Sequence, residues 1–200
     1  PGAAIRAGEW GHFSGQQSAL YTDLNEIVRL PVGSVLASLD AAILKHRSTL
    51  SGIDIKRMPN EWANWRAGLG YLLAKRYHLS RERRDIEQSC ECFVSALTAI
   101  DPSSNPRLYR DISRTMGDMC HQIALWEGSL RANGDALALS EQLLDDAVTS
   151  EERQKKLADM RGIALFACYA AVRLGQYEEA ARLAEAGRAR GSVDLMVASE

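Results

Sequence analysis

Apolar residues recur along most of this chain with the three- and four-residue spacing of an α-helix. The stripes are Leu20, Leu24, Ile27 and Val28; Val35, Leu39, Ile43, His46 and Leu50; Ile86, Cys90, Phe93, Val94, Leu97 and Ile100; Ile112, Met116, Met119, Cys120 and Ile123; and Leu157, Met160, Ala164, Ala167, Cys168 and Ala171. No segment shows the sustained two-residue alternation of a half-buried strand. The pattern predicts an all-α protein of about eight helices.

Residues typical of helix ends divide the chain in the same way, at Asn105-Pro106, at Thr149 with Glu152, and at Asn133-Gly134. The first is a capping side chain before a proline at the first helical position. The second fits a capping box. The third is expected to end one helix in a left-handed turn. The short connections between these elements favour antiparallel neighbouring helices.

The most regular part of the chain is the stretch 174–190. Leu174-Gly175 is expected to end one helix, and the following tract is expected to form the next, with an apolar stripe of Tyr177, Ala180, Ala181 and Ala184. This is the arrangement of the hinge and second helix of a tetratricopeptide (TPR) helix pair.

A similar unit occurs three times. A Leu-Gly-like pair on the first helix is followed by small and apolar or aromatic residues on the second: Leu69-Gly70 with Ser89, Phe93 and Ala96; Met116-Gly117 with Ser140, Leu144 and Ala147; Ala167-Cys168 with Gly175, Tyr177 and Ala180. Small residues let two helices cross closely, and the aromatic fills the gap between repeats.

These units predict antiparallel helix pairs stacked as a TPR-like right-handed superhelix over residues 60–190. A flexible lead-in is expected at 1–15, an N-terminal helical hairpin at 16–52, and a truncated junction at 191–200. A generic helical bundle with chance matches is the alternative.

One resemblance to a known family rests on two tracts. GLGYLLAKRYHLSRERRDIEQSCECFVSAL at 68–97 resembles the lengthened TPR units found upstream of CHAT domains, which are caspase- and separase-like cysteine peptidase modules. The tract 164–190 looks like the last helix pair before such a domain. A tract of the "ERGRAR" type often marks the junction in that family, and residues 185–190 are the similar tract in this chain. The family usually continues with a leucine pair, where this chain has Gly191-Ser192. The resemblance implies the regulatory or sensor arm of a longer protein, whose peptidase residues lie beyond residue 200.

Composition narrows the function classes. The net charge of −2 gives no broad basic field for nucleic acid, and no apolar run is long enough to span a membrane. The four cysteines form neither a disulfide framework nor a zinc pattern. We therefore expect a cytoplasmic protein with no metal, no cofactor and no nucleic-acid or membrane partner.

Adjacent side chains on a helix point about 100° apart, which argues against a Cys120-His121 nucleophile and base, and Cys120 is expected to be a buried structural cysteine. The side chains of Cys90 and Cys92 also point away from each other, which argues against a shared metal site.

The strongest basic cluster is expected to be a solvated helix face with local ion pairs, or alternatively a patch for an acidic partner; its members are Lys75, Arg76, His78, Arg81, Arg83 and Arg84. Four tryptophans are expected to fill gaps between helices, or alternatively to anchor a partner: Trp10, Trp62, Trp65 and Trp126.

The first helix of each pair lines the concave side of such a stack, which predicts the residues of a partner-binding groove. They are Asn64, Tyr71, Lys75, Asp111, Arg114, Asp118, His121, Gln122, Tyr169 and Arg173. This mixed-charge set suits a peptide or protein, including a C-terminal peptidase domain in the same chain. The expected function is a non-catalytic interaction scaffold. The alternatives are an all-α enzyme or ligand-binding bundle whose site is not visible in the sequence, and a self-assembling structural domain.

Overall fold

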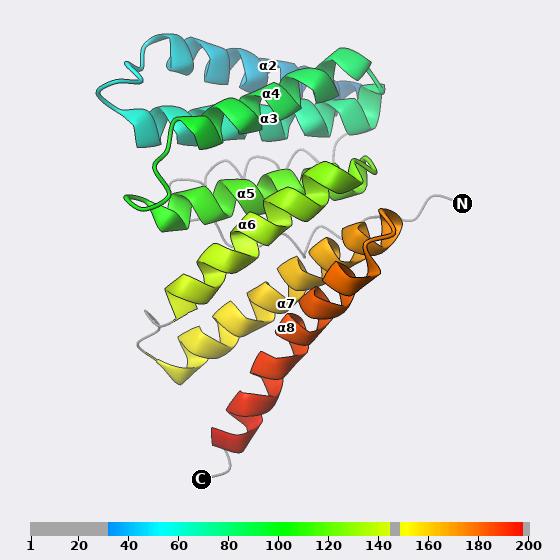
Figure 1. Ribbon diagram of the computed structural model, residues 1–200. Coiled ribbons are helices and arrows are strands. Elements are labelled where there is room, and N and C mark those ends of the chain that lie inside the picture. The colour runs from blue at the N-terminus through cyan, green and yellow to red at the C-terminus, as the bar shows by residue number, and fades with distance from the viewer. Residues whose placement is uncertain (1–31, 145–148, 198–200) are drawn as a thin grey trace.

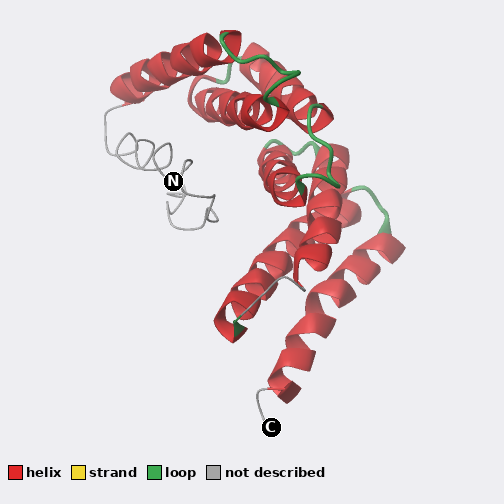
Figure 2. Cartoon of the chain, turned by 90° about the vertical axis from the view of Figure 1, so that its left-hand side faces the viewer, coloured by secondary structure: helices red, strands yellow, loops and turns green. Residues whose placement is uncertain are grey.

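The computed structural model describes residues 32–144 and 149–197, and every regular element in these two ranges is an α-helix (Figure 2). Seven helices are described: α2 (Val32–Ser51), α3 (Pro59–Ser80), α4 (Arg83–Thr98), α5 (Pro106–Gln122), α6 (Trp126–Leu144), α7 (Ser150–Arg173) and α8 (Tyr177–Val197). The all-α prediction is confirmed. The predicted stripe from Leu20 to Val28, the lead-in at 1–15, Trp10 and Ala147 lie outside the described residues.

The helices follow one another as antiparallel pairs (Figure 1). The pairs are α3 with α4, α5 with α6, and α7 with α8, and α2 packs on the first of them. The first helices of successive pairs also touch, because α3 contacts α5 and α5 contacts α7. Three apolar clusters hold this order together: one joins α2, α3 and α4, one joins α3 through α6, and one joins α6, α7 and α8. No helix in the described ranges is long and apolar enough to cross a membrane.

Local residues set three helix ends as predicted. Asn105 Oδ1 accepts a hydrogen bond from the Leu108 backbone N–H at 3.2 Å. Thr149 Oγ1 accepts one from the Glu152 N–H at 3.1 Å. After α7, Gly175 has a φ of 74°, a left-handed conformation that favours glycine. Each signal acts within four residues along the chain, and for that reason it is readable from the sequence.

The predicted break at Asn133-Gly134 is wrong, because α6 runs through both residues. The Asn133 side chain is fully buried between α5 and α6, where its Nδ2 donates to Ser129 Oγ at 3.3 Å. Packing against α5 therefore outweighs the local preference of this dipeptide for a turn.

Two glycines mark where the paired helices cross. A Cβ on Gly70 would lie 3.1 Å from Phe93 Cε2 and 3.1 Å from Cys92 Cβ, and the Gly70 carbonyl accepts from Ser89 Oγ at 2.7 Å. A Cβ on Gly117 would lie 2.5 Å from Asn133 Cγ. The small residue predicted opposite Gly117, Ser140, is also buried on α6, but it is not the residue at this closest approach.

The apolar stripe predicted on α8 is only partly correct. Ala180 is buried, but Ala181 is exposed and Tyr177 is 70% exposed. Leu183, which the prediction left out, is 1% exposed and packs among α6 and α7 residues. The helix also continues past the expected junction at 191 to Val197.

The basic cluster on α3 and α4 is less solvated than expected at one position. Arg76 forms two hydrogen bonds, at 2.8 and 2.6 Å, with the carboxylate of Asp85, which is 4% exposed. Arg76 also contacts Asp40 on α2 at 2.5 Å. Arg76 therefore ties three helices together, whereas Arg83 makes the expected surface pair with Glu87.

Candidate partner-binding surface

The predicted groove residues lie on the three helices that form the first members of the pairs. Asn64, Tyr71 and Lys75 are on α3; Asp111, Arg114, Asp118, His121 and Gln122 are on α5; Tyr169 and Arg173 are on α7. These helices touch in chain order, and two clusters of side chains join α5 to α7. One cluster is charged and the other is aromatic.

The charged cluster joins α5 to α7. Asp159 on α7 accepts hydrogen bonds from both Arg110, at 3.2 Å, and Arg114. Arg110 also bonds its neighbour Asp111, and Arg114 Nε lies 3.9 Å from Asp118 Oδ2. Sequence reasoning missed Arg110 and Asp159. The sequence does carry one signal for Asp159, because this acid lies between the apolar residues Leu157 and Met160, which are both buried.

These charged side chains hold helices together, and this limits how Arg114 can be tested. Its side chain is 20% exposed and its partners Asp118 and Asp159 are 11% and 23% exposed. Reversing the charge at Arg114 would place three acids side by side in a poorly solvated position. The binding role of Asp111, Arg114 and Asp118 stays a prediction, and exposed neighbours are the better positions for testing it.

Asp118 has an unusual titration. Burial raises the pKa of this carboxyl from 3.8 to about 6, against the opposing effect of the Arg114 guanidinium. Its Oδ1 atom is buried without a hydrogen-bond partner within the described part of the chain. An ionised carboxylate in this position is poorly solvated, so the folded protein holds this proton up to a higher pH than the unfolded chain does.

We expect Asp118→Asn to change how stability depends on pH. Because the folded-state pKa of Asp118 is raised, the folded protein binds more protons between about pH 4 and pH 6, and the wild type gains stability relative to the variant as pH falls from 7.5 to 4.5. A shift of this size corresponds to at most about 3 kcal/mol. Urea unfolding of both proteins at several pH values measures the difference. Both proteins contain His46, His78 and His121, whose pKa values are lowered by burial, so these histidines change the stability of both proteins equally as pH falls. Parallel curves of unfolding free energy against pH would therefore show that the pKa of Asp118 is not raised.

The aromatic cluster lies where α5, α6 and α7 meet. The His121 ring centroid is 4.7 Å from Phe166, 5.1 Å from Tyr169 and 5.6 Å from Trp126. The Arg173 guanidinium lies over the Trp126 ring at 4.8 Å from its centroid. Three predicted groove residues, His121, Tyr169 and Arg173, are therefore brought together. The predicted set had omitted Trp126 and Phe166.

On α3, the Lys75 Nζ lies 5.2 Å from the centroid of the Tyr71 ring. Burial lowers the pKa of Lys75 and raises that of Tyr71. Gln122 of α5 hydrogen-bonds His78 of α3, which links the first two pairs. Asn64 is half-buried on the same helix as Tyr71.

The prediction that Cys120 is a buried structural cysteine is confirmed. Cys120 is 1% exposed, its Sγ packs beside Gly128, and burial raises the pKa of its thiol to about 12. His121 turns instead into the aromatic cluster. Trp62 packs against the second apolar cluster and Trp65 packs edge-on to His46 with ring centroids 4.8 Å apart, as expected of gap-filling residues.

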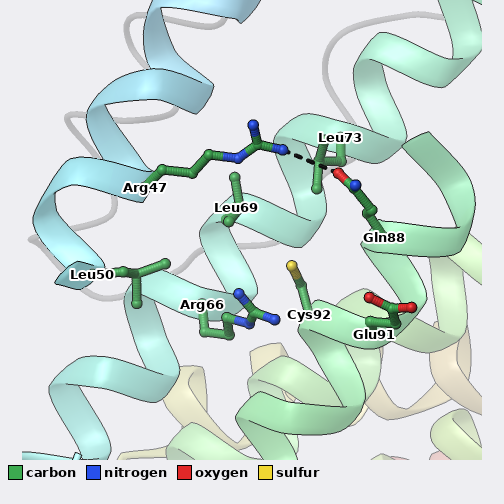
Figure 3. A pocket seen from close by; sticks show the side chains of 8 residues that line it. All are labelled: Arg47, Leu50, Arg66, Leu69, Leu73, Gln88, Glu91 and Cys92. Atoms are coloured by element: carbon green, nitrogen blue, oxygen red, sulfur yellow. Dashed lines mark hydrogen bonds between the residues drawn. The ribbon is translucent and has the colours of Figure 1, made fainter. Parts of the chain in front are cut away.

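A pocket of about 360 Å³ that sequence reasoning did not predict lies among α2, α3 and α4 (Figure 3). Leu50, Leu69, Leu73 and Cys92 give it apolar walls. Arg47 and Arg66 contribute guanidinium groups, and Arg47 Nη2 donates to Gln88 Oε1 at 3.0 Å at its edge. Its volume is at the small end for ligand pockets. If the ligand-binding alternative holds, this pocket is a candidate site for the ligand.

Comparisons of the chain with protein-family models, with curated proteins and with solved structures return no match.

Proposed function

We propose that this chain is a non-catalytic scaffold that binds a peptide or protein on the surface of α3, α5 and α7. The observation that carries the proposal is the contact of these three helices in chain order, each backed by its own second helix. Helix pairs stacked in this way present one extended surface, which suits an extended or helical partner better than a small substrate.

A TPR-like right-handed superhelix is the finer form of this proposal. It is supported by Gly70 and Gly117, which stand at the helix crossings where TPR units have small residues, and by the α7–α8 pair. The resemblance to the region upstream of CHAT domains extends the proposal to a regulatory arm of a longer, cytoplasmic protein. The unpaired state of all four cysteines fits that compartment. The parent reading frame beyond residue 200 tests this extension, because a CHAT domain would supply a His and a Cys at strand ends.

Selection of a displayed random-peptide library on the folded chain tests the scaffold proposal. Selected peptides are expected to bind at least about tenfold more weakly to Gln122→Lys/Tyr169→Ala than to the wild type. Both residues are exposed and belong to none of the three apolar clusters. The contacts that the variant loses are those of Gln122 with His78 and of Tyr169 with His121 and Trp126. Fluorescence anisotropy with purified variants measures the affinities.

The matched control is Gln142→Lys/Tyr177→Ala, which makes the same changes at exposed positions of α6 and α8. Its affinity is expected to equal that of the wild type. A loss in the control variant with none in the Gln122/Tyr169 variant would place binding elsewhere. Failure of the library to yield any binding peptide would favour the small-ligand alternative.

A further inference from the structure

Part of the exposed side of α7 is apolar. Leu165 is 67% exposed, Val172 45% and Tyr169 44%, and Ala158 is exposed on the same side of the helix. At 100° per residue these four side chains fall within one narrow sector, opposite the buried face that includes Met160, Ile163 and Ala167. We call Ala158, Leu165, Tyr169 and Val172 the α7 stripe.

A helix that is apolar on two opposite faces normally has neighbours on both. α7 contacts α5, α6 and α8. Ala158, Leu165 and Val172 belong to none of the three apolar clusters, whereas Tyr169, at one edge of the stripe, contacts His121 and Trp126. Beside the stripe, a Cβ on Gly162 would meet no atom within 4 Å. The backbone is therefore open to close approach by another helix at this point. From Ala158 to Val172 the stripe runs about 21 Å, the length of about four helical turns.

The charges beside the stripe indicate what covers it. Arg161 lies along one edge, and Lys155 and Arg173 lie along the other; all three are exposed. None of them forms an ion pair with a residue that the structure describes. Glu151 is the acid on this side, and it lies two turns before the stripe. Both edges of the apolar stripe are thus basic.

We propose that the α7 stripe docks an amphipathic helix that carries acidic side chains on both sides of its own apolar face. This inference rests on the proposed scaffold function and names the chemistry of its partner. Leucine-type side chains would cover Leu165 and Val172 while carboxylates pair with Arg161, Lys155 and Arg173. A second copy of this chain is a poorer occupant, because two such stripes would bring basic edges together.

The test uses two synthetic 18-residue fluorescein-labelled peptides with leucines at helical i, i+3, i+4 and i+7 spacing. One has glutamate at the flanking positions and the other has lysine. The glutamate peptide is expected to bind the wild-type chain at least about tenfold more tightly than the lysine peptide at low salt. Leu165→Ser/Val172→Ser should lose that binding, and Lys155→Glu/Arg161→Glu should reverse the preference.

Matched controls make the same changes on other helices. They are Leu79→Ser/Val94→Ser, at side chains 42% and 49% exposed, and Lys45→Glu/Arg84→Glu, both exposed. Both controls should bind as the wild type does. Equal affinity for the two peptides, or unchanged binding by the Leu165/Val172 variant, would overturn the inference. The inference would also be overturned if light scattering showed that the wild type is a dimer and that the Leu165/Val172 variant is a monomer. A second copy of the chain would then be the occupant of the stripe.

These outcomes are separable from the fate of the scaffold proposal. Library peptides that depend on Gln122 and Tyr169 but not on Leu165 and Val172 would leave the scaffold standing and remove only the acidic-helix partner. Library peptides whose binding depends on none of these four residues would contradict both the scaffold proposal and the acidic-helix partner.

Discussion

Gly117→Ala is expected to destabilise the fold by about 3 kcal/mol, because the new methyl group overpacks the α5–α6 crossing. A Cβ at this position would lie 2.5 Å from Asn133 Cγ and 2.6 Å from Asn133 Oδ1. Asn133 is fully buried, so its side chain has no solvent-filled space into which to turn. The higher helix propensity of alanine recovers only about 1 kcal/mol of this cost. Urea unfolding with a shared m-value measures the change.

Gly134→Ala is the control, because Gly134 follows Asn133 in the same helix and a Cβ there would meet nothing within 4 Å. It should stabilise the protein by about 0.5–1 kcal/mol. In the double variant Gly117→Ala/Asn133→Ala the clash is removed, so the two changes should couple by more than about 1 kcal/mol. Additive effects would show that Asn133 does not limit the approach of the two helices.

Phe93→Ala is expected to cost about 4 kcal/mol, the loss typical of a large aromatic side chain removed from a core. Phe93 is 0% exposed and belongs to the cluster that joins the first helix pair to the second. Its ring also packs against the backbone of Gly70 at the α3–α4 crossing. Truncation would therefore leave a cavity at two helix contacts at once.

The neighbouring residue supplies the comparison. Val94 is 49% exposed on the same helix, and Val94→Ala should change the free energy of unfolding by less than about 1 kcal/mol. Thermal and urea unfolding of both variants measure the two costs. Similar losses at the two positions would mean that Phe93 does not fill the space between the pairs.

Much of the fold is readable from local sequence. The apolar stripes on α2, α5 and α7 become buried faces, and the ends at Asn105, Thr149 and Gly175 form as their residue types predict. The exceptions are informative. α6 passes through Asn133-Gly134 because burial against Gly117 outweighs a turn preference, and α8 buries Leu183 rather than Tyr177 because its orientation follows its neighbours.

The candidate surface was less predictable. The phase of each first helix predicts ten side chains for one surface, but the partners that several of them contact come from far along the chain. Asp159 joins Arg110 across 49 residues and Arg114 across 45 residues, and no spacing rule within one helix links these positions. Trp126 and Phe166 join the aromatic cluster from α6 and α7 for the same reason.

The sequence alone determined that the chain is helical, where most helices lie, and which residues are small enough or apolar enough to pack. These properties follow from side-chain spacing within a few turns, because a helix has the same period wherever it sits. Only the tertiary structure decided which residue meets Gly117, how Arg76 and Asp159 join separate helices, and that α7 has a second apolar face, largely exposed within the described part of the chain. Each depends on how whole helices stack, since a side chain's burial and partners are set by its neighbours in space.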